Sequence, residues 1–370
     1  MGTHSADGGS VPPDLRHRGA RYVRSETVEG LSIYRPGGEF EDSGSSTAVA
    51  EQPLALAVAR DKPVLVTGAA GLVGTHTCRE LVRRGWKVRA LVRDAAKGAS
   101  RLGEQKLELR VGDIRDERAL ADALRGASAV VHLAAIAIER GQDSYESSNT
   151  DATVALLRQA AGAGATRFIY MSQNGASSSS PYEFLRSKGI AEDAVRASGL
   201  RWTALKPSVI FGPQDAFINV LARMIRLSPL VFPIPGGGRA RFQPIAVRDV
   251  AATVAISLDR DDTIGSAYGL GGPAELSLRE MTERILVAMR TQRMLLPVPV
   301  AMLRPLVALM QRVVPKPPVT TGLLDLLSMD NTVPENEIRR TFGISPIPFA
   351  PEEIEYVRRV TLRNAIESLF

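Results

Sequence analysis

The chain has 370 residues, of which 44% are hydrophobic and 23% are charged, so it is long and apolar enough to fold around a substantial core. Its formal charge is only +6 and aromatic residues make up 5%, which disfavours the basic, aromatic-rich surfaces of nucleic-acid-binding proteins. A single cysteine, Cys78, excludes an internal disulfide framework and a cysteine-built metal site. The longest apolar run, Met294 to Leu303, is too short to cross a bilayer, and we predict no metal site.

Residues 1–60 are rich in Gly, Ser, Pro and charged residues and show no sustained periodicity. This composition predicts a mostly disordered N-terminal extension. Acidic residues outnumber basic ones within it, which argues against an organellar transit peptide.

From Asp61 onward, short apolar runs alternate with longer segments of helical periodicity. The runs have little apolar–polar alternation, which is typical of parallel strands covered on both faces. We therefore predict an α/β protein with a Rossmann-type doubly wound parallel sheet over residues 61–255. Helices are expected to end at Gly85, Gly126 and Gly199. The expected strands lie in KPVLVTG, KVRALVR, KLELRVGD, AVVHLAA, RFIYMSQ and WTALKPSVIFG.

Beyond Pro213, proline- and glycine-rich segments predict a smaller, mostly helical C-terminal domain over residues 256–370, with a contribution from 214–240. Between Met281 and Thr320, basic residues outnumber acidic ones and are interleaved with Met, Leu and Val. This stretch has two interpretations, a helical lid over a substrate cleft or a surface that lies on an anionic membrane or a partner. We accordingly expect a cytoplasmic protein, with peripheral membrane association as the second interpretation.

The most informative motif is TGAAGLVG, from Thr67 to Gly74, which directly follows an apolar strand and directly precedes a helix. Gly68 permits the tight turn, Gly71 lets the backbone approach a pyrophosphate, and Gly74 allows close packing of helix on strand. The helix N-terminus then offers free N–H groups and partial positive charge to the anion. The motif in this context predicts dinucleotide binding.

The end of the second strand indicates which dinucleotide is bound. Arg93 stands where readers of NAD place a carboxylate for the ribose 2′-hydroxyl, and a guanidinium suits the 2′-phosphate of NADP(H). Asp94 would serve the hydroxyl if the register slips by one residue. At the end of the third strand, Asp113 is expected either to accept a hydrogen bond from the adenine amino group or to cap the next helix.

Taken together, these motifs resemble the extended or atypical short-chain dehydrogenases and, within them, proteins similar to subunit 9 of the alpha subcomplex of respiratory complex I. The resemblance rests on TGAAGLVG, VVHLAA, SNT, LRSKG, KPSVIFGP, GGGRARFQPIAVRDVA and LLSMDN and covers about 290 residues. It implies a Rossmann fold and bound NADP(H), and a respiratory or membrane-surface partner. With the loop motif, it assigns these residues to the cofactor: Thr67, Gly68, Ala70, Gly71, Leu72, Val73, Gly74, Arg93, Asp113, Ile114, Leu133, Ala134, Ala135, Lys188, Pro207 and Ser208.

Active members of that family use Tyr-x-x-x-Lys and a serine after the fifth strand to move the proton while hydride moves to or from the nicotinamide. Lys188 fits the lysine position, but Phe184 stands four residues earlier, where a tyrosine is expected. Tyr182 lies two residues away, which rotates it by about 200° on a helix. Either Ser172 or Gln173 falls at the serine position.

Two functions follow from this pattern. The first is a structural or redox-sensing protein that holds the cofactor while its proton-transfer machinery is impaired. The second is a working NADP-dependent oxidoreductase, or an enzyme of the nucleotide-sugar epimerase and dehydratase type, that uses Tyr182 or another acid.

Overall fold

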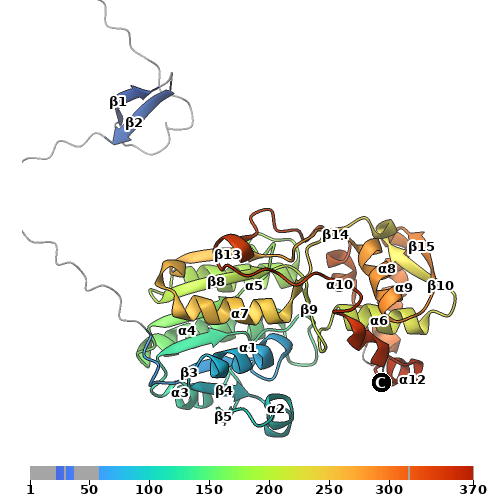
Figure 1. Cartoon of the computed structure of the whole chain (residues 1–370), viewed down its shortest axis with the longest axis horizontal. Helices are drawn as coiled ribbons and strands as arrows, with labels where there is room; N and C mark the ends of the chain where they lie inside the picture. The colour runs from blue at the N-terminus through green and yellow to red at the C-terminus, as the bar shows by residue number, and fades with distance from the viewer. Residues whose placement is uncertain (1–21, 29–30, 37–57, 316, 370) are drawn as a thin grey trace, which may run out of the picture. The chain divides into compact units, whose positions relative to one another are not determined.

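A computed structural model describes residues 22–28, 31–36, 58–315 and 317–369 of the chain (Figure 1). The chain divides into two compact units, residues 1–54 and 55–370. In the first unit, β1 (Tyr22–Val28) pairs antiparallel with β2 (Leu31–Pro36). This hairpin departs from the expected absence of regular structure, because its β-branched and aromatic residues favour strands. The rest of the expected disordered extension, up to residue 57, lies outside the described residues.

The second unit is built on a seven-stranded sheet in which every pair of neighbours is parallel. The strands lie in the order β13-β8-β7-β6-β3-β4-β5. The direction of winding therefore reverses between β3 and β6, and ligands of open parallel sheets bind at the carboxyl edge beside such a switch point. The strands are β3 (Val64–Thr67), β4 (Val88–Val92), β5 (Glu108–Val111), β6 (Ala129–His132), β7 (Arg167–Met171), β8 (Arg201–Pro207) and β13 (Ser266–Leu270).

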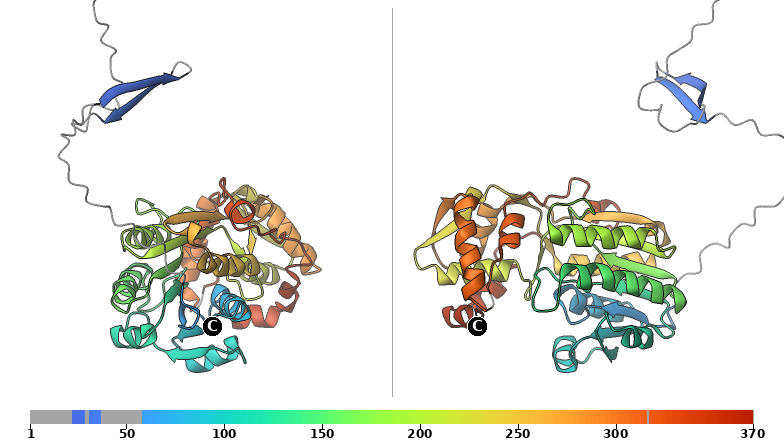
Figure 2. Two further views of the ribbon diagram at one scale, coloured as in Figure 1. Left: turned by 60° about the vertical axis from the view of Figure 1, so that its left-hand side comes forward. Right: turned by 180° about the vertical axis from the view of Figure 1, so that it is seen from behind.

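Helices cover both faces of this sheet, as Figures 1 and 2 show. On one face Cys78 of α1 and Val254 of α7 belong to one buried core, and on the other Leu120 of α3, Leu156 of α4 and Ala191 of α5 belong to a second. The first layer contains α1 (Leu72–Arg83), α2 (Ala95–Leu102) and α7 (Val247–Asp259); the second contains α3 (Glu117–Leu124), α4 (Ala152–Gly162), which follows a π-helical turn, η2 (Glu146–Asp151), and α5 (Glu183–Arg196).

The predicted Rossmann-type sheet is confirmed, and each of the six expected runs contains a strand. Gly85, Gly126 and Gly199 all have positive φ, as expected where helices end. The prediction missed β13, which lies in the range assigned to the C-terminal domain and yet pairs with β8. Its sequence, SAYGL, is short and mixed in polarity, so nothing local distinguishes it from a loop.

Most of the remaining elements form a smaller, mostly helical part with its own core. Two short elements instead join the sheet, since Ile338 belongs to a core of the sheet and Thr263 is hydrogen-bonded to Arg167 and Thr203. Short parallel and antiparallel pairs accompany the helices, namely β9 with β12, β11 with β14 and β10 with β15. No helix in the described ranges combines the length and the apolar character that crossing a bilayer requires. The elements are β9 (Ile210–Phe211), α6 (Ile218–Leu227), β10 (Val231–Pro235), η3 (Gly236–Gly238), β11 (Arg241–Phe242), β12 (Ile245–Ala246), η4 (Asp261–Thr263), β14 (Leu276–Ser277), α8 (Leu278–Ala288), β15 (Met294–Val298), α9 (Val300–Val313), α10 (Thr321–Leu326), α11 (Glu337–Arg340), η5 (Glu355–Arg359) and α12 (Leu362–Glu367).

Candidate functional site

A cleft of about 400 Å³ opens at the carboxyl edge of β3, β4, β5 and β6, beside the switch point. Nine of the sixteen residues predicted to hold a cofactor line it. The other seven are Thr67 at the end of β3, Leu72, Val73 and Gly74 in α1, Lys188 in α5, and Pro207 and Ser208 at the end of β8 and just after it. The nine are Gly68, Ala70, Gly71, Arg93, Asp113, Ile114, Leu133, Ala134 and Ala135.

The glycine loop forms the floor of the cleft and tolerates no added side chain at two positions. Gly68 has φ of +67°, and a Cβ there would lie 2.7 Å from the amide nitrogen of Ala134. A Cβ on Gly74 would lie 2.2 Å from the carbonyl oxygen of Gly68, so this glycine lets α1 pack directly on the turn. The loop is therefore a backbone cradle without side chains at these positions, as the glycine loops that bind a pyrophosphate are.

The amino end of α1 faces this cradle. Gly71 is its N-cap, no side chain caps the helix, and its first turn contains no acidic residue. Leu72 and Val73 begin the helix; Val73 packs against the core and Leu72 lies close to Gly212 after β9. The first N–H groups of the helix thus provide partial positive charge at this end, and no carboxylate of the first turn competes for them. Such a helix end suits an anion.

Buried hydrogen bonds hold β6, the neighbour of β3 in the sheet, against the glycine loop. Thr67 Oγ1 lies 2.7 Å from His132 Nδ1, and His132 Nε2 lies 2.8 Å from Thr153 Oγ1. Burial, together with the charge of Lys188, lowers the pKa of His132 to about 3, so this ring is neutral. The Ala134 amide also donates to Thr67 Oγ1, at 3.4 Å, which fixes the small residues that follow β6 along the cleft wall.

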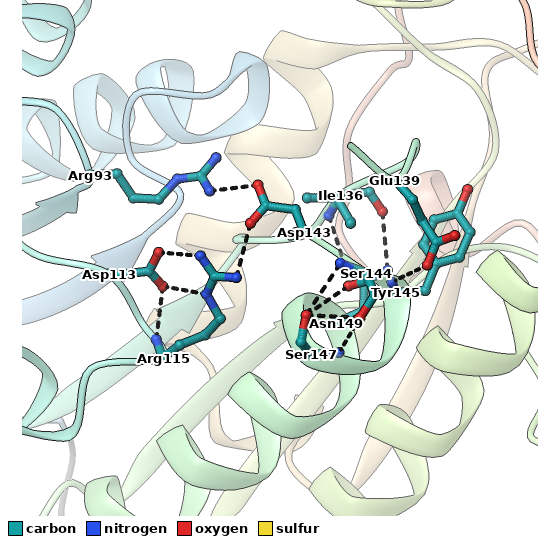
Figure 3. Close-up of polar contacts among 10 residues, drawn as sticks. All are labelled: Arg93, Asp113, Arg115, Ile136, Glu139, Asp143, Ser144, Tyr145, Ser147 and Asn149. Atoms are coloured by element: carbon teal, nitrogen blue, oxygen red, sulfur yellow. Dashed lines mark hydrogen bonds and ion pairs between the residues drawn. The ribbon is translucent and has the colours of Figure 1, made fainter. Parts of the chain in front are cut away.

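Charged side chains crowd the end of the cleft at β4 and β5, as Figure 3 shows. Arg93 follows β4, lines the cleft and pairs with Asp143 at 3.0 Å. Asp94 accepts a hydrogen bond from the Lys97 amide as N-cap of α2, so its carboxylate serves the helix. Arg115 binds both oxygens of Asp113, and these hydrogen bonds lower the pKa of that carboxyl.

Asp113 therefore lies on the cleft wall with its carboxylate engaged by Arg115. The alternative expectation, that Asp113 caps the following helix, is wrong. Asp116 is the N-cap of α3, since its Oδ1 accepts hydrogen bonds from the amides of Arg118 and Ala119. Helix α3 therefore begins three residues later than this alternative predicts, and the turn between β5 and α3 is longer by the same amount.

Lys188 lies beside the other half of the sheet, on the β6–β7 side of the switch point. It is buried on α5, donates from Nζ to the carbonyl oxygen of Met171 at 2.6 Å and lies over the ring of Tyr170. Burial lowers its pKa to about 7, an effect that the carboxylate of Glu192 partly opposes. Phe184 lies one turn earlier on the same helix, and its ring packs against that of Tyr145 at 5.8 Å.

The other two catalytic candidates are placed differently. Tyr182 is the N-cap residue of α5, with extended backbone, so it precedes the first helical residue and does not share the helical backbone of Phe184 and Lys188. Ser172 is buried, and its hydroxyl donates to Glu192 at 2.6 Å. That hydroxyl is therefore committed to a neighbouring carboxylate inside the fold.

Pro207 and Ser208 end β8 and are tied to the C-terminal part of the chain. The Pro207 carbonyl accepts from the Asn174 amide at 3.0 Å. Ser208 Oγ donates to the Asn331 carbonyl at 2.6 Å and accepts from the Gln243 amide at 3.2 Å. Asn331, the last residue of LLSMDN, thus contacts the chain just after the carboxyl end of β8.

Sequence reasoning missed several residues around the cleft, and two of these, Arg115 and Asp143, form an ion pair at its rim. Arg115 lines it from the turn after β5, and Asp143 reaches Arg93 and Arg115 from the loop after β6. VGDIRD contains an arginine two residues after the aspartate, which hints at Arg115. The 50-residue separation of Arg93 and Asp143 leaves no local pattern that would reveal their pairing.

Comparison with known proteins agrees with this geometry. A family model described as NAD(P)H-binding matches residues 68–220, which include the glycine loop and the whole cleft wall. Residues 68–220 therefore form a domain of the NAD(P)H-binding kind. The glycine loop, the uncapped helix end and the guanidiniums of Arg93 and Arg115 fit a nicotinamide dinucleotide.

Its relatives include respiratory-chain subunits and reductases. It is 31% identical over 226 residues to the alpha subcomplex subunit 9 of mitochondrial NADH dehydrogenase [ubiquinone] 1 from Arabidopsis thaliana, a match that covers 59% of this chain and 56% of that protein. It is 34% identical over 190 residues to a ceramide reductase from Caulobacter vibrioides, covering 51% and 58%. An NAD(P)H azoreductase from Xenophilus azovorans is 29% identical, covering 61% and 73%. The chain thus spans somewhat more than half the length of the first two relatives.

Solved structures share the fold. The dTDP-glucose 4,6-dehydratase of Streptomyces venezuelae, determined with NAD, has a TM-score of 0.63 at 22% identity, covering 80% of this chain and 96% of that one. The UDP-glucuronic acid 4-epimerase of Bacillus cereus, also determined with NAD, has a TM-score of 0.63 at 18% identity, covering 80% and 99%.

Proposed function

We propose that this protein holds NADP(H) as a structural or redox-sensing cofactor and does not carry out the proton transfer that active short-chain dehydrogenases perform at this position. The observation that carries the proposal is the hydrocarbon ring of Phe184, one turn before the buried amine of Lys188. A phenyl ring has no proton to give or take, so a bound nicotinamide would lack the usual acid or base beside it.

The hydrogen bonds around the site support the same conclusion. Ser172 donates its hydroxyl to Glu192, and Tyr182 is the N-cap of α5, six residues before Lys188 rather than four. Lys188 itself is suited to binding the nicotinamide ribose, because its amine lies at the carboxyl end of β7. Binding groups are thus present where proton-transfer groups are missing.

The preference for NADP(H) is supported by the charges at the β4 end of the cleft. Arg93, Lys97 and Arg115 line this end, and Asp94, the residue that would read the ribose 2′-hydroxyl of NAD, caps α2. A guanidinium binds a phosphate through forked, charge-assisted hydrogen bonds.

The test combines binding with turnover. NADPH is titrated into the full chain by its fluorescence, and its oxidation is then followed with a panel of simple carbonyl and quinone substrates. We expect saturable binding without steady oxidation of NADPH. Steady turnover that is abolished by Lys188→Met would overturn the proposal of impaired catalysis.

A working reductase is the second candidate, because two relatives are named as reductases. In that case another group must supply the proton. Tyr182 is the candidate from the sequence, since its ring is half-buried at the start of α5. If Tyr182→Phe abolishes a measurable turnover while NADPH binding survives, this second candidate replaces the first.

We also propose that the protein associates peripherally with an anionic membrane through α9. One face of this helix packs against α10 and α6, whereas an adjacent face leaves a stripe of apolar side chains exposed. Arginines flank this stripe in the chain, and apolar side chains beside basic ones suit an anionic lipid interface. None of the described α9 residues lines the cofactor cleft, which disfavours the lid interpretation. The stripe consists of Met302, Leu306, Leu309 and Val313.

A further inference from the structure

Asp143 lies between two arginines at the adenosine end of the cleft (Figure 3). Its Oδ2 pairs with Arg93 Nη1 at 3.0 Å and its Oδ1 pairs with Arg115 Nη1 at 2.9 Å. Each carboxylate oxygen thus takes one guanidinium. The arginines follow neighbouring strands, β4 and β5, and both line the cleft. The Asp143 carboxylate therefore bridges two guanidiniums at the rim of the cleft.

The carboxylate reaches this place from a distant strand. Asp143 belongs to the segment after β6, and β3 lies between β6 and β4 in the sheet. A tight turn aims it, since the Arg140 and Asp143 backbones exchange two hydrogen bonds around Gly141, which has φ of +58°. The segment therefore extends across the carboxyl edge of β3 to contact the arginines.

Both ends of this segment are anchored independently of the arginines. Asn149 binds the backbone N–H and C=O of Ile136, and the hydroxyls of Ser144 and Ser147 bond to each other at 2.9 Å. Between these anchors, Asp143 is the residue that joins the segment to the β4 and β5 side. Ala137 and Glu139 are held as well, because the Tyr145 hydroxyl donates to the Ala137 carbonyl at 2.9 Å and the Tyr145 amide donates to Glu139 Oε1 at 2.7 Å. Loss of the Asp143 ion pairs would therefore release residues 140–143 without disturbing Ile136 or Asn149.

The same two guanidiniums are the groups that an adenosine 2′-phosphate would use. A phosphate monoester carries about −1.5 to −2 charge and three acceptor oxygens, more than the single charge of a carboxylate. Arg115 binds Asp113 through Nε and Nη2, and these bonds persist whether Asp143 or a phosphate occupies its Nη1. A phosphate would therefore replace Asp143 only at Arg115 Nη1 and at the Arg93 guanidinium.

We propose that Arg93 and Arg115 form one binding site for the 2′-phosphate of NADP(H), and that Asp143 is an internal competitor for this site that sets the preference between NADP(H) and NAD(H). The inference rests on the proposed function, which places a nicotinamide dinucleotide in this cleft. NAD(H) leaves the pairs of Asp143 intact, whereas NADP(H) exchanges them and frees residues 140–143. The protein thereby distinguishes the two cofactors by the state of one surface segment.

The test is the Asp143→Asn variant, which keeps the shape of the side chain and removes its charge. Asp122→Asn is the matched control, because Asp122 also lies between two arginines, Arg110 and Arg125, away from the cleft. Affinities for NADPH, NADH and adenosine 2′,5′-bisphosphate are measured by calorimetry. Amide hydrogen exchange of residues 140–143 is followed with each nucleotide.

We expect Asp143→Asn to bind NADPH and the bisphosphate about fivefold more tightly, as loss of two partly exposed ion pairs implies. The NADH affinity of Asp143→Asn should change by less than about twofold. All three affinities of Asp122→Asn should likewise stay within about twofold of the unmodified chain, which is within the effect of a distant surface charge. In the unmodified chain, NADPH but not NADH should speed exchange in residues 140–143. An unchanged or weakened NADPH affinity in Asp143→Asn would overturn the inference alone; failure of the unmodified chain to bind any of the three would overturn the proposed function with it.

Discussion

Phe184 and Lys188 lie one helical turn apart on α5, so a hydrocarbon ring precedes the buried amine at the position from which a tyrosine would serve the nicotinamide. The ring packs against Tyr145, and the amine is bound to the carbonyl of Met171. On the proposed function, Lys188 holds the cofactor and the phenyl ring of Phe184 leaves the proton-transfer position without an acid or base.

Phe184→Tyr should restore part of the missing chemistry. A hydroxyl added to this ring would stand one turn from Lys188, and a positioned acid or base contributes about 10²- to 10⁴-fold to such reactions. We expect NADPH oxidation with simple carbonyl substrates to rise by about tenfold or more, limited because Ser172 stays bound to Glu192. Adding Lys188→Met should remove the gain; a variant with unchanged turnover would speak against the role assigned to this position.

The buried amine of Lys188 should make stability depend on pH. Its pKa is about 7 in the folded protein and near 10.5 in the unfolded chain, so the unfolded state holds more protons between these values. The free energy of unfolding should therefore rise with pH across this window, by up to about 1.4 kcal/mol per unit from this group. Urea titrations should show a shallower rise in Lys188→Met, whereas Lys87→Met, at an exposed site, should follow the unmodified chain. Parallel profiles for all three proteins would contradict the lowered pKa.

Gly74→Ala should weaken both the fold and the cradle. The added Cβ would lie 2.2 Å from the Gly68 carbonyl oxygen, so α1 must shift, at a cost of about 1–3 kcal/mol in the free energy of unfolding. Gly162→Ala is the matched control, since it also lies in a helix and its Cβ meets open space. The control should range from neutral to about 1 kcal/mol more stable. Equal effects of the two variants in thermal unfolding would show that the loop is not tightly packed.

The exposed stripe on α9 should direct membrane binding. Leu306→Glu combined with Leu309→Glu places two charges on this face, and we expect flotation with anionic vesicles at low salt to fall about tenfold or more. Ile190→Glu, an exposed apolar site on α5, should float like the unmodified chain. Failure of the unmodified chain to float with such vesicles would remove the membrane proposal.

The sequence predicted those parts of the fold that depend on local pattern. Buried apolar runs, the glycine loop and the helix-ending glycines are each encoded within a few neighbouring residues, and all were found in place. β13 escaped prediction because a short strand of mixed polarity is recognised only by its partner, β8. The pairing of Asp143 with Arg93 and of Ser172 with Glu192 depends on how distant elements approach, which a single sequence does not reveal.

The proposal that this cleft holds NADP(H) through Arg93 is tested by calorimetric titration of the unmodified chain and Arg93→Ala with NADPH and NADH. Removing a guanidinium that pairs with a phosphate should weaken NADPH binding by about tenfold and leave NADH binding within about twofold. Equal weakening for both nucleotides, or no binding of either by the unmodified chain, would contradict it.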